Sequence, residues 1–172
     1  MKILKVLALM ILLPNAAFAA DNFAQYYEVN SWHKHNLTEK VVLTARRDLS
    51  KKVVRQYEGV FEEASRKFSL ATGINTKLCR ERLEIRLVSL GELNSKKYFP
   101  TENVYGNVTG RYFRHSNTLY MVPVFRWRHH NWESWRKSYA HELAHYFFDA
   151  CSVSTLNNRV EHMAIDTFER RF

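Results

Sequence analysis

Apolar positions recur with helical spacing in three stretches of the chain. Over residues 50–71 they stand three and four positions apart, with Ser50 placed to cap the start and Gly73 just beyond the end. Residues 132–150 repeat this spacing, and residues 157–170 follow with an asparagine at either of the first two positions as a cap. We therefore predict three helices.

Other stretches have the composition and alternation of strands. Residues 83–90 alternate between apolar and polar side chains, and the runs 108–113 and 118–124 are rich in β-branched and aromatic residues on either side of a short turn. These patterns predict one strand and a β-hairpin. Residues 21–38 are predicted to be an irregular lead-in, and residues 91–106 a loop. The order helix, strands, helix, helix predicts an α+β domain with a small mixed or antiparallel sheet.

The beginning of the chain has a different pattern. A short basic start precedes an unbroken apolar run over residues 6–13, and the sequence Ala-Phe-Ala follows at 17–19. This order is typical of a secretory signal peptide, cleaved after Ala19 or Ala20. The apolar run is shorter than the about 20 residues that span a bilayer. We expect residues 1–19 to be a signal peptide, no membrane anchor after its removal, and a secreted or periplasmic location.

Composition indicates that the remaining residues, 20–172, form one folded and basic domain. Hydrophobic residues make up 46% of the chain, with only five Gly and three Pro, which excludes disordered and collagen-like classes. Two of the 26 Lys and Arg residues leave with the signal peptide, so 24 stand against 17 acidic residues, a net charge of +7. No nucleic-acid motif accompanies this charge, so no nucleic-acid partner is predicted, and we expect a monomer. One interpretation is a non-catalytic secreted protein that binds an anionic polymer.

One segment combines two imidazoles and a carboxylate within five residues. It is His141-Glu142-Leu143-Ala144-His145, inside the predicted helix at 132–150. The two histidines are four positions apart, so both imidazoles lie on one helix face and can reach the same ion. Glu142, rotated by about 100° from its neighbour, can sit beside the metal and take a proton from water. The motif therefore predicts a centre for one Zn²⁺ per chain, with Glu142 as the catalytic base.

This segment resembles the active-site helix of the zincin metallopeptidases. In the metzincin branch, a glycine and a histidine would stand where this chain has Phe148 and Cys151. The gluzincin branch takes a glutamate from a following helix, and Glu161 matches it. Resemblance to a minimal gluzincin implies that residues 20–172 form a zinc-dependent metallopeptidase acting on a peptide or protein substrate. The metal ligands that it implies are His141, His145 and Glu161.

Several details of this site stay open at the level of sequence. Thermolysin-like gluzincins have a supporting aspartate four residues beyond the glutamate, where this chain has Ile165; Asp166, one position later, is the candidate for that role. Alternative third ligands are His162, Asp149 and Asp166. The same zinc chemistry could also act on a cell-wall amide.

The predicted hairpin occupies the place of the substrate-binding strand in this family. In gluzincins, the strand before the last lies at the rim of the cleft and pairs with extended substrate, and residues 108–114 hold that place here. The resemblance assigns Val108, Gly110 and Tyr112 to the substrate edge. Candidates for stabilising an oxyanion or a substrate carboxylate are Tyr112, His115, His129 and His130.

Two cysteines, Cys79 and Cys151, remain after removal of the signal peptide. An even number in an oxidising compartment favours a disulfide. This bond would tie the end of the motif helix to the region after the first helix and stabilise the fold by about 4 kcal/mol. Zinc ligation by Cys151 is the alternative.

Overall fold

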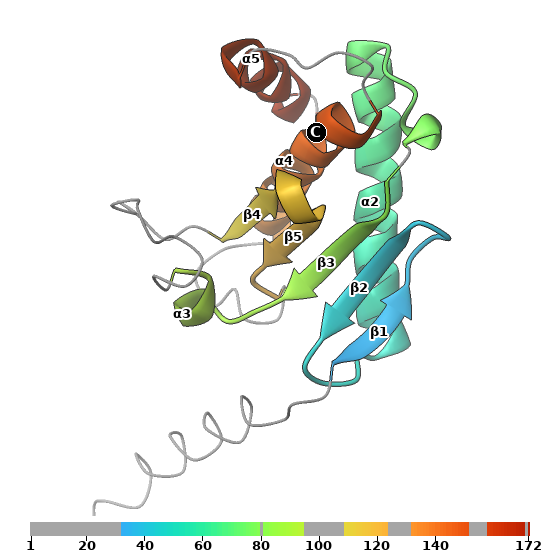
Figure 1. Ribbon diagram of the computed structural model, residues 1–172, viewed down its shortest axis with the longest axis vertical. Coiled ribbons are helices and arrows are strands. Elements are labelled where there is room, and N and C mark those ends of the chain that lie inside the picture. Colours follow the sequence, from blue (N-terminus) through green and yellow to red (C-terminus); the bar gives the residue numbers. More distant parts are fainter. Residues whose placement is uncertain (1–31, 80, 95–108, 124–131, 152–157, 171) are drawn as a thin grey trace, which may run out of the picture.

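The computed structural model describes residues 32–79, 81–94, 109–123, 132–151, 158–170 and 172 (Figure 1). Within these ranges, one five-stranded mixed sheet has the order β1-β2-β3-β5-β4. The strands are β1 His33–Asn36, β2 Val41–Ala45, β3 Leu83–Leu87, β4 Gly110–Phe113 and β5 Thr118–Met121. The helices are α2 Lys51–Thr72, α3 Leu90–Leu93, α4 Trp132–Cys151 and α5 Asn158–Glu169, with the short 3-10 helices η1 Thr76–Leu78 and η2 Arg114–Ser116. The predicted α+β class and mixed sheet are confirmed.

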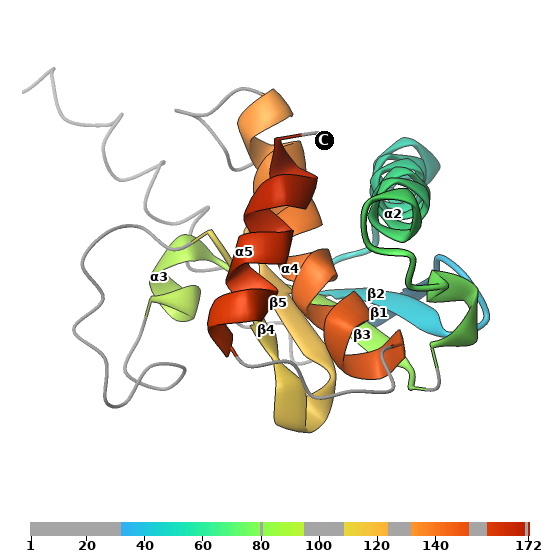
Figure 2. The ribbon, with the colours of Figure 1, turned by 90° about the horizontal axis from the view of Figure 1, so that it is seen from above.

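Three helices lie on one side of the sheet. Figure 2 shows α2 and α4 over the same face, with α5 against α4, and α4 also packs on β4 and β5. The centre of the sheet is parallel, because α2 carries the chain from β2 across to β3. β4 pairs antiparallel with β5 and is the last strand in the sheet order, so the predicted hairpin is confirmed. Val108, predicted for the same strand, lies outside the described residues.

The long helix α2 follows its sequence pattern closely. The side chain of Ser50 accepts a hydrogen bond from the Val53 N–H at 3.4 Å, and Gly73 ends the helix in the left-handed conformation, with φ of 74°. Its buried residues are Tyr57, Val60, Ala64 and Phe68. The predicted caps are both confirmed, and the apolar face covers the sheet.

Two predictions about irregular segments are wrong. Part of the lead-in at 21–38 is the strand β1, which pairs antiparallel with β2, and β2 itself was not predicted. All five residues of β2 are buried, so this strand lacks the alternation that marks a half-exposed strand. The predicted loop at 91–106 begins inside α3, where Ser89 accepts a hydrogen bond from the Glu92 N–H at 3.0 Å and caps the helix.

Helix α4 is buried along most of its surface, which fixes its rotation. Trp135 and Tyr139 pack edge-on against Tyr57 of α2, with ring centroids 4.9 and 5.5 Å from it, and Phe147 lies 5.2 Å from Phe68. These anchors turn the opposite side of α4, with both histidines of the motif, towards α5. Within the described part of the chain, no helix is long and apolar enough to cross a lipid bilayer.

The C-terminal end of α4 is held by the predicted disulfide. Cys151 is bonded to Cys79, which follows η1, and the two are 72 positions apart in the sequence. A cross-link over a loop of this length stabilises the fold by about 4 kcal/mol in the chain-entropy account. Since its sulfur is used in this bond, the alternative of Cys151 as a zinc ligand is wrong.

Candidate metal centre

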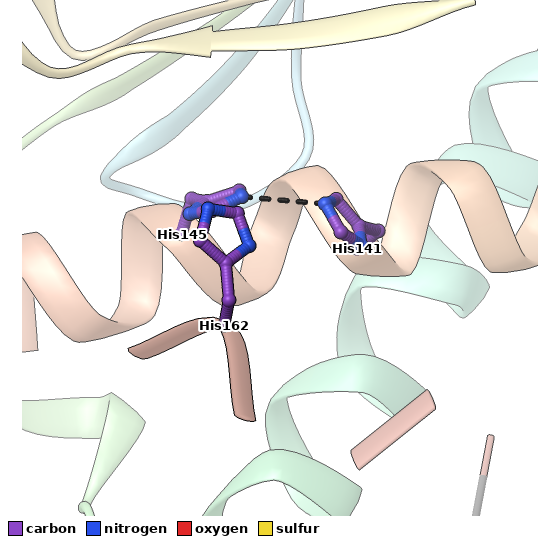
Figure 3. Close-up of side chains that lie close together, drawn as sticks. All are labelled: His141, His145 and His162. Carbon is purple, nitrogen blue, oxygen red and sulfur yellow. Dashed lines mark hydrogen bonds between the residues drawn. The ribbon is translucent and has the colours of Figure 1, made fainter. Parts of the chain in front are cut away.

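Three imidazoles meet where α5 crosses α4 (Figure 3). His141 and His145 come from successive turns of α4, and His162 reaches them from α5. One ligand nitrogen from each ring lies within 4.8 Å of the other two, and the Nε2 atoms of His141 and His145 are 3.3 Å apart. Two nitrogens bound at about 2.0–2.1 Å to a tetrahedral zinc lie about 3.3–3.4 Å apart, so this spacing fits such an ion.

The outer nitrogens of the two α4 histidines face carboxylates. His141 Nδ1 lies 2.7 Å from Glu169 Oε1, and His145 Nδ1 lies 2.8 Å from Glu161 Oε1. An ionised carboxylate only accepts hydrogen bonds, so Nδ1 of each neutral ring carries the proton and Nε2 presents a lone pair. The two Nε2 atoms, 3.3 Å apart, can share a proton in a hydrogen bond or bind one metal ion together. The donor set is therefore suited to a metal ion.

Glu161, the third ligand implied by the family resemblance, occupies a supporting position. Its side chain is only 4% exposed; Oε1 contacts His145 Nδ1, and Oε2 lies 3.1 Å from Arg114 Nη2. Among the described residues, the group that could hold a metal consists of His141, His145 and His162. The next residue on α5, His162, thus lies close to both α4 imidazoles, and Glu161 contacts the outer nitrogen of one of them, His145 Nδ1.

Arg114 links the carboxylates behind the cluster. Besides Glu161, it contacts Asp149 through Nε at 2.8 Å, and the Tyr112 hydroxyl donates to Asp149 Oδ2 at 3.1 Å. Burial and the Asp149 carboxylate raise the pKa of Tyr112, so its hydroxyl stays protonated as a donor. Asp149, an alternative ligand in the sequence, is therefore engaged by Arg114 and Tyr112. The Tyr112 hydroxyl faces Asp149 and Asn117, not the imidazoles.

Glu142 lies between α4 and the edge strand β4. Its Oε2 accepts a hydrogen bond from the Tyr112 backbone N–H at 2.7 Å. A Cβ atom at Gly110 would stand 3.0 Å from Glu142 Cγ, so the absence of a side chain allows this close approach. Burial raises the pKa of Glu142, although the two α4 imidazoles and the Tyr112 N–H act in the opposite direction. The carboxylate is thus held beside the cluster and against the predicted substrate strand.

A pocket opens on the His141 side of the cluster. Its volume is about 290 Å³, which is room for one side chain or terminal group and less than a typical drug-sized site. Its lining residues are Thr109, Gly110, Lys137, Ser138, His141, Glu142 and Glu169. A group seated in this pocket would lie next to both the predicted base and the imidazole of His141.

Some candidate residues are not brought to this site. Asp166 is exposed, and the described hydrogen bonds to the α4 imidazoles use Glu161 and Glu169 in its place. His115 is exposed on η2. The candidates His129 and His130 lie outside the described residues.

Sequence reasoning missed Glu169 and Arg114. Glu169 follows Glu161 by eight positions and His162 by seven, which are spacings of one helix face. That repeat is a signal from which Glu169 could have been found. Arg114 carries no such signal, because it reaches Glu161 across 47 positions of sequence.

Comparisons of the chain with protein-family models, with curated proteins and with solved structures find no match. A function for the chain therefore rests on the chemistry of its own side chains. The two features that bear on it are the imidazole cluster and the carboxylate of Glu142 at its edge.

Proposed function

We propose that the chain is a zinc-dependent metallopeptidase in which His141, His145 and His162 hold the ion and Glu142 is the general base. The observation that carries this proposal is the pair of Nε2 atoms at 3.3 Å, each on a ring whose Nδ1 faces a carboxylate. Three protein ligands and one open position are the usual arrangement of catalytic zinc.

The ligand set differs from the gluzincin set in one residue. His162 supplies the third nitrogen, and Glu161 supports His145, as carboxylates commonly support metal-bound histidines. Three neutral imidazoles leave the charge of the ion uncompensated. This favours zinc acting as a strong Lewis acid, which when bound polarises a carbonyl and lowers the pKa of water.

Glu142 carries the proton-transfer chemistry. It takes a proton from the attacking water and returns it to the leaving amine, as a general base and then a general acid. The hydrogen bond from the Tyr112 N–H at 2.7 Å fixes its carboxylate at the junction of α4 and β4. A substrate carbonyl delivered along β4 would therefore meet the base without a large movement of either element.

The edge position of β4 supports a peptide as the substrate. Only β5 pairs with β4 among the described strands, so main-chain groups on the other edge of β4, apart from the Tyr112 N–H that donates to Glu142, can bind an extended peptide. This favours a peptidase over an enzyme that hydrolyses cell-wall amides lacking an extended backbone. The Cys79–Cys151 disulfide supports a secreted or periplasmic location, which agrees with the signal peptide predicted from the sequence.

The test combines metal analysis with hydrolysis of a peptide library. We expect about one zinc per chain, cleavage by the wild type, and loss of cleavage in Glu142→Gln with zinc still bound. Zinc retention in this variant is the control that separates loss of the base from loss of the site. A Glu142→Gln protein that cleaves as fast as the wild type would refute the mechanism.

A further inference from the structure

The pocket beside His141 contains one ammonium group. Lys137 lies one helical turn before His141 on α4 and lines the pocket together with the hydroxyl residues Thr109 and Ser138. The side chain of Lys137 is exposed, and none of the ion pairs within the described part of the chain uses it. Its charge is therefore available to a ligand.

The two carboxylates of the pocket are already engaged. Glu142 accepts the hydrogen bond from the Tyr112 N–H, and Glu169 faces His141 Nδ1 at 2.7 Å. Hydrogen bonds to a carboxylate stabilise its negative charge, so these two carboxylates attract a cationic group of a ligand less strongly. Lys137 has no such partner among the described residues. An anionic group of a ligand would therefore form an ion pair with Lys137 without displacing another residue.

The hydroxyl groups add to this preference. Thr109 Oγ1 lies 3.4 Å from Ser138 Oγ, at the place where the start of β4 meets α4. A hydroxyl can donate to a carboxylate oxygen, as an ammonium group can. Since the Thr109 hydroxyl donates to Ser138 Oγ, the donors left for a group about the size of one side chain are the Lys137 ammonium group and the Ser138 hydroxyl.

We infer that this pocket is a specificity subsite for a carboxylate next to the scissile bond, with Lys137 as the residue that recognises it. The inference rests on the proposed peptidase function and names its substrate class: peptides with an acidic side chain, or with a free terminal carboxylate, at the position bound beside His141. Lys137 acts in recognition, and Glu142 in proton transfer.

Matched peptides test the inference. Amidated, acetylated hexapeptides carry a single Glu at each position in turn, and a second series carries Gln there; a third series has free C-terminal carboxylates. Cleavage by the wild type gives kcat/KM, and calorimetry with the full-length, zinc-loaded Glu142→Gln protein gives Kd without turnover. At one position we expect Glu, or the free terminus, to be favoured about tenfold, as for one partly exposed charge-assisted hydrogen bond.

Three variants separate recognition from general effects of charge. Lys137→Met keeps much of the side-chain length and should reduce the Glu-to-Gln ratio to about one, and Lys137→Glu should favour a Lys peptide instead. Lys52→Met removes an exposed lysine from the start of α2 and should leave the ratio as in the wild type. A terminal-carboxylate preference and an interior Glu preference both support the inference and identify the source of the group.

The inference and the proposed function fail in different ways. Three results with an active wild type would overturn the subsite without affecting the proposed peptidase function. They are a Glu-to-Gln ratio of kcat/KM of one at every position, a ratio that does not change in Lys137→Met, and a preference for Lys. Peptide binding with a Lys137-dependent preference for Glu, but no cleavage by the wild type, would refute the peptidase and leave the subsite standing.

Discussion

Glu161 Oε1 lies 2.8 Å from His145 Nδ1, on the opposite side of the imidazole from the nitrogen that faces His141. A carboxylate in this position fixes the orientation and the protonated nitrogen of the ring. The adjacent residue, His162, instead joins the two α4 histidines in the group that could hold a metal ion. Two neighbours on α5 therefore have different parts in the proposed site, and their substitutions should have different effects.

Separate substitutions of Glu161 and His162 distinguish a metal ligand from a residue that orients a ligand. Glu161→Gln should bind about one zinc per chain, with an affinity about 10–100-fold lower, because the amide still contacts His145 without the negative charge. His162→Ala should lose more affinity than this, because one of three ligands is absent. Competition with a chromophoric chelator measures both constants. The reverse order of the two losses would identify Glu161 as the ligand.

Gly110 should be sensitive to the smallest side chain. In Gly110→Ala the new methyl group would lie 3.0 Å from Glu142 Cγ and push the carboxylate or β4 aside. Since a displacement of about 1 Å near reacting groups can lower a rate about 100-fold, we expect kcat/KM for peptide hydrolysis to fall by about this factor. Steady-state kinetics and zinc content are the measurements.

A second glycine provides the control for this substitution. Gly59 is exposed on α2, and a methyl group added there would meet no other atom within 4 Å. Gly59→Ala should therefore stabilise the helix by up to about 1 kcal/mol without changing kcat/KM. Equal activity of Gly110→Ala and the wild type would show that β4 and Glu142 need no such close approach.

The disulfide should contribute to stability and leave zinc binding intact. Cys79→Ser combined with Cys151→Ser should lower the free energy of unfolding by about 4 kcal/mol, because the unfolded chain loses its cross-link. Urea unfolding measures this loss. The variant should still bind one zinc per chain in conditions where it is folded, and loss of zinc from the folded variant would contradict the three-histidine ligand set.

Acid should weaken the contact between α2 and α4. Glu63 contacts Lys67 Nζ at 3.0 Å and Arg136 Nη2 at 2.6 Å. Burial alone would raise the pKa of Glu63, but the hydrogen bonds and charges of these two cations outweigh it and hold the pKa below its ordinary value of 4.5. Because the folded pKa is the lower one, the stabilisation is present above the unfolded pKa and is lost as the pH falls through the folded pKa.

Unfolding by urea at several pH values tests this contribution. Between about pH 6 and pH 3, Glu63→Gln should lose less stability than the wild type, because it lacks the carboxylate that becomes protonated. The matched control is Glu62→Gln, an exposed neighbour that forms none of the described ion pairs. Parallel stability curves for Glu63→Gln and the wild type would refute this role of Glu63.

Local periodicity was sufficient for the three long helices, α2, α4 and α5, and for the hairpin. Both caps of α2, and the antiparallel pairing of β4 with β5, agree with what the sequence predicts. The strand β2 was missed because burial on both faces removes the alternating pattern, and β1 was missed because its polar residues show their strand character only once β2 lies beside them. These are effects of neighbours that are not adjacent in sequence.

The sequence by itself determined that His141 and His145 share one face of α4, because four positions make about one helical turn. It also placed Glu142 next to them and Glu161 and His162 together on a later helix. Only the tertiary structure decided which of those two neighbours adds a nitrogen to the group that could hold a metal and which one contacts His145 Nδ1. Adjacent residues point about 100° apart, so the choice depends on how α5 is rotated where it packs on α4, which is fixed by contacts between distant segments of the chain.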